Sequence, residues 1–224
     1  MFRKMLLSPF FAPVVFVALF GLSVCSVYFG CHDYILQITE DGQWIDVTAK
    51  IGYILLIAVL FYFCNDFRDK MTSWGIYLFF SLACFLRESG IQHHLSATDS
   101  TPFKSRFFLN PNNPLGEKII FGAVLILIFG ALAYIVVKYT KSLVLSFFKF
   151  NPLTWTIAVL CTDGVVGKLI DRYPANYRKA HGGMSLPDDV YSVFQLVEET
   201  SEMFLPYLAM LAIFQYHQLR KISK

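Results

Sequence analysis

The sequence predicts an all-α, polytopic integral membrane protein with about six transmembrane helices in one bundle. Hydrophobic residues make up 56% of the chain and charged residues only 16%, whereas soluble domains carry about 25% charged residues. The apolar residues also gather in six runs, and a spanning helix needs about 20 mostly apolar residues. Helices are expected because each one satisfies its own backbone hydrogen bonds in lipid.

The six runs define the spans of a single transmembrane domain over residues 1–224. Pro13 lies at the entry of the first run and Pro152 opens the fifth, and the first turn is where a helix tolerates proline. The fourth helix can continue as far as Phe150, while the third and fifth spans are short enough for a tilt or a break. The predicted spans are 10–30, 47–64, 71–86, 119–137, 153–170 and 191–216, with outer loops at 31–46, 87–118 and 171–190.

The first run follows Arg3 and Lys4, as the apolar core of a signal peptide does. Its core is long, its small-residue cleavage signal is poor, and Val24 disrupts a lipobox before Cys25. We therefore expect this segment to be a retained signal anchor.

The distribution of Lys and Arg predicts the orientation in the membrane. With six spans and an inside N-terminus, the inner segments hold ten of the 19 Lys and Arg residues, whereas the outer loop 31–46 holds none. We therefore expect both termini in the cytoplasm, and the compact chain suits a bacterial inner membrane. The net charge of +3 then reflects cations that anchor the inner face, and no nucleic-acid partner is expected.

Carboxylates inside the fifth and sixth predicted spans are the strongest functional signal. Gln195, Glu198, Glu199 and Glu202 follow one another at i, i+3, i+4 and i+7, which is one face of a helix. The helical rise puts Glu198 about 10 Å and Glu202 about 17 Å below the outer surface, and Asp163 about 15 Å from the inner one. Charge at such depth costs about 2.5–3.5 kcal/mol, so a proton, a metal or a cation should compensate it. The candidate cations are Arg87, Lys168, Arg172 and Lys50.

Two interpretations of these carboxylates stay open. In a water-filled pocket, Glu198, Asp163 and Glu88 are candidate catalytic groups, with a carboxylate as general acid and base. Alternatively, the carboxylates hold helices together through hydrogen bonds and ion pairs. Lys168 and Arg172 either clamp a phosphate or carboxylate or extend to the membrane interface. The candidate substrate-binding residues are Arg87, Lys168, Arg172, Gln195, Glu199, Glu202, Lys104 and Arg106.

The longest polar interval, 86–114, is expected to form an outer rim and lid over the pocket. His93 and His94 are its candidate metal ligands, and a divalent metal is therefore a candidate cofactor. Adjacent residues diverge by about 100° on a helix, however, and the chain lacks the HxxxH and HExxH patterns of zinc sites. Lys104 and Arg106, beside several Phe residues, indicate either a short interfacial helix that binds anionic lipid or an ordinary surface loop.

The sequence supports functions from two classes. In the first, an outward-facing, carboxylate-lined pocket binds or chemically alters an amphiphilic or lipid-linked substrate in the outer leaflet. In the second, the chain is a non-enzymatic subunit of an oligomeric channel, transporter or membrane-sensing complex. Membrane lipid, a second copy of the chain and another membrane subunit are the candidate partners. A cavity that Asp163 and Glu198 share and that opens to the outer leaflet would favour the first class.

Overall fold

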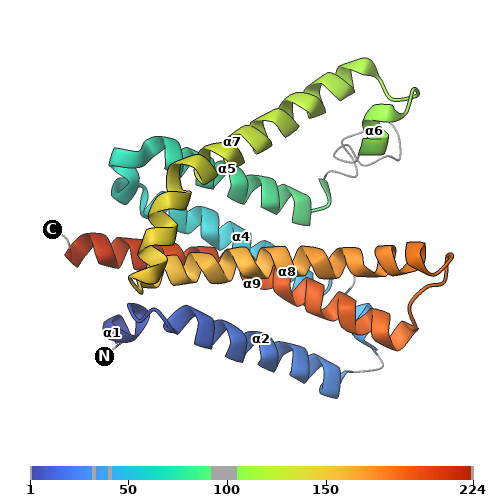
Figure 1. Ribbon diagram of the computed structural model, residues 1–224, viewed down its shortest axis with the longest axis horizontal. Helices are drawn as coiled ribbons and strands as arrows, with labels where there is room; N and C mark the ends of the chain where they lie inside the picture. The colour runs from blue at the N-terminus through green and yellow to red at the C-terminus, as the bar shows by residue number, and fades with distance from the viewer. Residues whose placement is uncertain (1, 32–33, 40–41, 92–104, 223–224) are drawn as a thin grey trace. The chain divides into compact units, whose positions relative to one another are not determined.

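The computed structural model describes residues 2–31, 34–39, 42–91 and 105–222 (Figure 1). The chain is 87% helical and has no strand in these ranges, and four helices are long and apolar enough to cross a membrane. The predicted class of all-α membrane protein is therefore confirmed at this level. The four helices are α2 (Phe11–Gly30), α4 (Trp44–Tyr62), α7 (Leu115–Phe148) and α8 (Pro152–Ala180).

The chain divides into two compact units, residues 1–66 with 146–224 and residues 67–145. The first unit contains α2, α4 and α8 together with α1 (Phe2–Leu6), α3 (Ile35–Ile38) and α9 (Asp188–Ile222). The second contains α5 (Met71–Glu88), α6 (Ser105–Leu109) and most of α7. A 3₁₀ helix, η2 (Cys64–Lys70), runs across the boundary.

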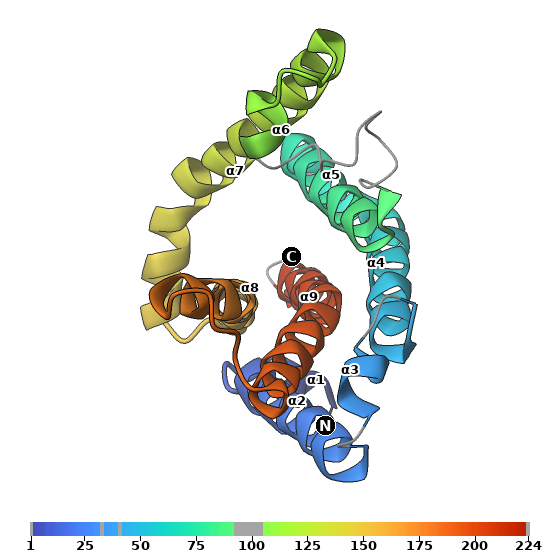
Figure 2. The same cartoon turned by 90° about the vertical axis from the view of Figure 1, so that its right-hand side faces the viewer.

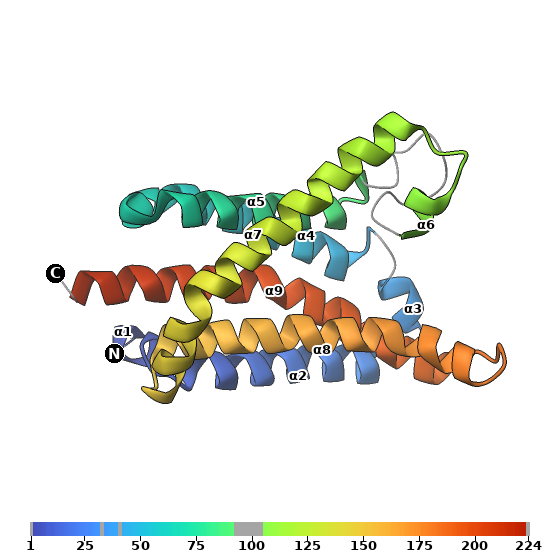
Figure 3. The same ribbon diagram turned by 45° about the horizontal axis from the view of Figure 1, so that its top comes forward.

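In the first unit, α9 is the central helix, with α8, α2 and α4 around it (Figure 2). Its buried side chains include Leu196 and Met203, which share an apolar core with Ile45 and Ala49 of α4. The helices α2 and α8 run away from α1, whereas α4 and α9 run back, so α1 and the last turns of α9 lie at one end of this unit (Figures 1 and 3).

In the second unit, Phe107 of α6 is fully buried, and its ring lies 5.5 Å from that of Phe121 on α7. The Asn and Pro residues between these helices form a turn, and Asn113 Nδ2 donates to the backbone oxygen of Phe107 at 2.7 Å. Ser73 and Tyr139 form a hydrogen bond that joins α5 to α7.

The predicted spans 71–86 and 191–216 are helices, α5 and α9, but they are not among the four apolar ones. The α5 helix ends on the charged pair Arg87-Glu88, and α9 contains three glutamates in its first half. The loop predicted at 171–190 is shorter in the structure, because α8 continues to Ala180 and α9 begins at Asp188.

Pro174 thus lies inside α8 rather than in a loop. A proline within a helix costs about 3 kcal/mol or more, and packing on α9 offsets this cost. Just before Pro174, Tyr173 stacks on Phe194 of α9, with ring centroids 4.7 Å apart. The sequence signal for a loop was therefore overridden by a contact between helices.

Candidate functional site

The candidate site lies on the helical hairpin of α8 and α9. The Asn151 side chain caps α8 by accepting from the Leu153 backbone N–H at 3.0 Å, and Pro152 occupies the first turn. At the other end, Gly182 and Gly183 have positive φ angles of 63° and 97°, which glycine adopts without strain. The chain can therefore reverse within a few residues, and the two helices pack along their length (Figure 3).

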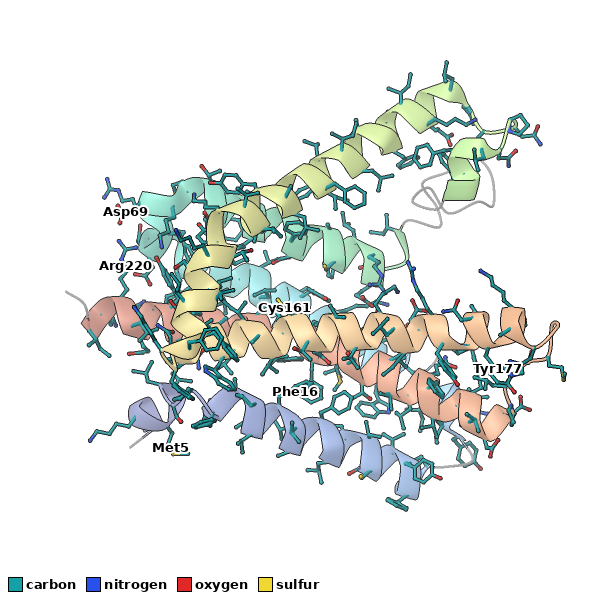
Figure 4. All side chains as sticks on the ribbon, viewed as in Figure 1. Met5, Phe16, Asp69, Cys161, Tyr177 and Arg220 are labelled. Carbon is teal, nitrogen blue, oxygen red and sulfur yellow. The ribbon has the colours of Figure 1, made fainter. Side chains whose placement is uncertain are left out.

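A pocket of about 220 Å³ opens between the two helices, and we call it the α8–α9 pocket. One wall comes from α9 and consists of Tyr191, Phe194, Gln195 and Glu198. The facing wall comes from α8 and consists of Ile170, Asp171, Pro174, Ala175 and Arg178. Tyr177, labelled in Figure 4, marks the part of α8 beside which the pocket lies. The pocket combines two acids, one cation, one amide and two aromatic rings.

The pocket contains two of the predicted site residues, Gln195 and Glu198. Both are half-buried, and they lie one helical turn apart on the face of α9 that meets α8. The other acid, Asp171, forms an ion pair with Lys168 of the same helix. The pocket therefore presents a cation at Arg178 and carboxylates at Glu198 and Asp171.

Asp163 is not part of this pocket. Its side chain is 6% exposed and faces α9, where Ser201 Oγ donates a hydrogen bond to Asp163 Oδ1 at 2.6 Å. Gly167, one turn along α8, allows this close approach, because a Cβ there would lie 2.6 Å from Ser201 Oγ. The structure thus separates Asp163 and Glu198, which the pocket hypothesis places in one cavity.

Two of the predicted compensating cations, Lys50 and Lys168, pair with acids on their own helices. Lys50 Nζ lies 2.6 Å from Asp46 Oδ2, and Lys168 pairs with Asp171. Arg172 is exposed on α8. Each lysine pairs with an acid on its own helix, one turn away, because such a pair forms without depending on a second helix.

The remaining predicted site residues lie elsewhere. Glu199 and Glu202 are half-buried on α9 and do not line the α8–α9 pocket. Arg87 and Glu88 end α5 in the second unit. His93, His94 and Lys104 lie outside the described residues, as does the Arg106 side chain. Among the side chains that the structure describes, no group of three or more His, Cys, Asp or Glu could hold a metal ion.

Three residues that line the pocket or form hydrogen bonds between helices of the first unit were not predicted as site residues. Arg178 lies in the pocket, and its spacing of seven residues from Asp171 is the signal that could have found it. Ser201 was missed because no pattern within one helix reveals a partner on another. Gln215 is fully buried, where it accepts from Thr156 Oγ1 at 2.6 Å and donates to the Leu6 backbone oxygen at 2.9 Å. A polar residue that follows an apolar run was the available signal for Gln215.

We compared the chain with protein-family models, with curated proteins and with solved structures, and none of the three comparisons gave a match. The candidate site is therefore interpreted from its own geometry.

Proposed function

We propose that the chain is a multi-pass membrane protein that binds the polar head group of an amphiphile in the α8–α9 pocket. The observation that carries this proposal is a cavity lined by both Arg178 and Glu198, next to Ile170, where the apolar part of α8 ends. The anionic part of such a head group would contact Arg178 and its cationic part Glu198, and Tyr191 and Phe194 would contact its carbon atoms.

The size of the pocket supports a head group rather than a whole ligand. Drug-sized ligands occupy pockets of about 300–1,000 Å³, and the α8–α9 pocket measures about 220 Å³. An amphiphile would place only its polar part there and leave its hydrocarbon chains in the lipid.

The length of α8 supports a position at the membrane surface. Its 29 residues extend about 43 Å, whereas the hydrocarbon core of a bilayer is about 30 Å thick. One end of α8 must therefore project, and 171–180 is its polar end.

We further propose six spans in one bundle, with both termini in the cytoplasm of a cell with an inner membrane. The hydrogen bond between Asp163 and Ser201 supports α9 as a span. It joins α9 to α8 side by side, so if α8 crosses the membrane, the paired part of α9 lies in the membrane too. Met184 lies in the hairpin turn and is 68% exposed. In a cysteine-free protein, the Met184→Cys variant should react with an impermeant thiol reagent added outside cells. Ile222→Cys, 59% exposed near the C-terminus, should react only after permeabilisation, and the reverse pattern would contradict this orientation.

Head-group binding can be measured with purified protein and soluble short-chain phosphatidylethanolamine below its micellar concentration. Arg178→Gln and Glu198→Gln should each weaken binding about tenfold or more, since a hydrogen bond to a charged group contributes about 1.5–3 kcal/mol. The matched controls are Lys179→Gln and Glu199→Gln, which change a neighbouring charge outside the pocket. Equal affinities in all four variants would refute the proposal, and binding of phosphatidylglycerol alone would indicate an anion site instead.

A further inference from the structure

The environment of Asp163 is unusual for a buried aspartate. Ser201 Oγ lies 2.6 Å from its Oδ1 and 3.3 Å from its backbone oxygen. The second carboxyl oxygen, Oδ2, is buried and has no hydrogen-bond partner within the described part of the chain. Within the described part of the chain, the Asp163 carboxyl group therefore has the Ser201 hydroxyl group as its hydrogen-bond partner, although Asp163 is only 6% exposed.

Asp46 of α4 provides a direct contrast at the same degree of burial, because it is 7% exposed. Its Oδ2 accepts from the Gly42 backbone N–H at 2.6 Å and from Lys50 Nζ at 2.6 Å. Asp46 thus accepts from a cation and from a backbone donor, and neither kind of donor contacts Asp163 within the described part of the chain.

The charged groups near Asp163 do not replace such a cation. On its own helix, Lys168 is already paired with Asp171. On α9, the acids next to Ser201 in sequence are Glu198, Glu199 and Glu202, and on α2 the titratable residues are Cys25 and Tyr28. The hydrogen-bond partner of Asp163 is thus a neutral hydroxyl group, and its Oδ2 has no hydrogen-bond partner in the described residues. An isolated buried charge costs far more than a buried neutral group.

The neutral acid fits the geometry. When Asp163 is ionised, Ser201 Oγ donates to Asp163 Oδ1. When Asp163 is neutral, this direction reverses: the proton on Oδ1 is donated to Ser201 Oγ, and the Ser201 hydroxyl proton is donated to the Asp163 backbone oxygen 3.3 Å away. Each O–H then has an acceptor, and Oδ2 becomes an uncharged carbonyl oxygen. The arrangement needs one proton and no further ligand.

We propose that Asp163 and Ser201 form a proton-binding site between α8 and α9, in which Asp163 carries a proton at neutral pH. The site is separate from the α8–α9 pocket and does not rest on head-group binding. Because Gly167 brings the two helices together at Ser201, release of the proton would place an uncompensated charge in this helix contact.

Infrared spectroscopy of the protein in lipid can test this proposal. At neutral pH, the difference between the wild-type spectrum and the Asp163→Asn spectrum should contain the C=O stretching absorption of one carboxylic acid per chain. Asp46→Asn is the matched control, and it should remove carboxylate absorption instead. Loss of carboxylate rather than carboxylic-acid absorption in Asp163→Asn would overturn the proposal.

A second variant keeps the proposal testable if Asp163→Asn fails to fold. Ser201→Ala retains the acid but removes its hydrogen bond, so the carboxylic-acid absorption should move to higher frequency without losing intensity. An unchanged carboxylic-acid spectrum in folded Ser201→Ala would count against the site. Head-group affinity should stay within about twofold of wild type in both variants, so failure here is distinguishable from failure of the pocket proposal.

Discussion

The central helix α9 approaches two neighbours closely at glycines, and the two contacts differ in chemistry. At Gly52 of α4, an added Cβ would lie 2.7 Å from Pro206 Cγ and 3.0 Å from Tyr207 Cε2. At Gly167 of α8, it would lie 2.6 Å from Ser201 Oγ and 3.3 Å from Ser201 Cβ. The distances are similar, but a proline ring cannot move aside, whereas a hydroxyl group can rotate.

This comparison suggests different roles for the two contacts. The α4–α9 contact is built from rigid hydrocarbon, and Tyr207 adds a hydrogen bond to the Thr48 backbone oxygen at 3.0 Å. The α8–α9 contact contains a carboxyl group and a hydroxyl group, whose interaction depends on a proton. The α4–α9 contact therefore holds α9 mainly by packing, and the α8–α9 contact can respond to its chemical environment.

The largest effect is expected for Gly52→Ala. We expect it to lower the free energy of unfolding by about 3 kcal/mol, the upper end of the usual range for overpacking, because the facing ring is rigid. Chemical unfolding in detergent would measure the change. Gly21→Ala on α2 is the matched control, since nothing lies within 4 Å of its added Cβ. Equal stability of the two variants would show that the α4–α9 contact is not rigid.

A smaller effect is expected for Gly167→Ala. The new methyl group would displace the Ser201 hydroxyl from Asp163, and a hydrogen bond contributes about 1 kcal/mol net. The same unfolding experiment on Gly167→Ala, Ser201→Ala and the double variant would measure the coupling. We expect the two changes to be less than additive, because both remove one hydrogen bond. Full additivity would mean that Gly167 and Ser201 act independently, and the contrast with Gly52 would fail.

Much of the fold could be predicted from the sequence because helix formation in lipid depends on local composition. Apolar runs located α2, α4 and α5 with small errors at their ends, whereas α7 ends at Phe148 rather than at residue 137, and α9 at Ile222 rather than at residue 216. The prediction was weakest at 171–180, which was expected to be part of a loop but continues α8, with Tyr173 stacked on Phe194. Composition alone contains no information about that stacking.

The candidate site divides in the same way. Helical spacing placed Gln195 and Glu198 on one face of α9, and the structure brings both into the α8–α9 pocket. The addition of Arg178, and the separation of Asp163 from the pocket by its bond to Ser201, depend on how α8 and α9 pack. The predicted depth of the carboxylates and their roles in binding or catalysis stay predictions.

By itself, the sequence determined the membrane class, the positions of the long helices and the presence of costly carboxylates in the two that form the hairpin. These properties follow from residue type and spacing along one chain segment. Only the tertiary structure decided which partner each carboxylate has. Asp46 and Asp163 are both aspartates and are buried to nearly the same degree, at 7% and 6% exposed. They differ because one meets a lysine and a backbone N–H, and the other meets a hydroxyl group across a helix contact.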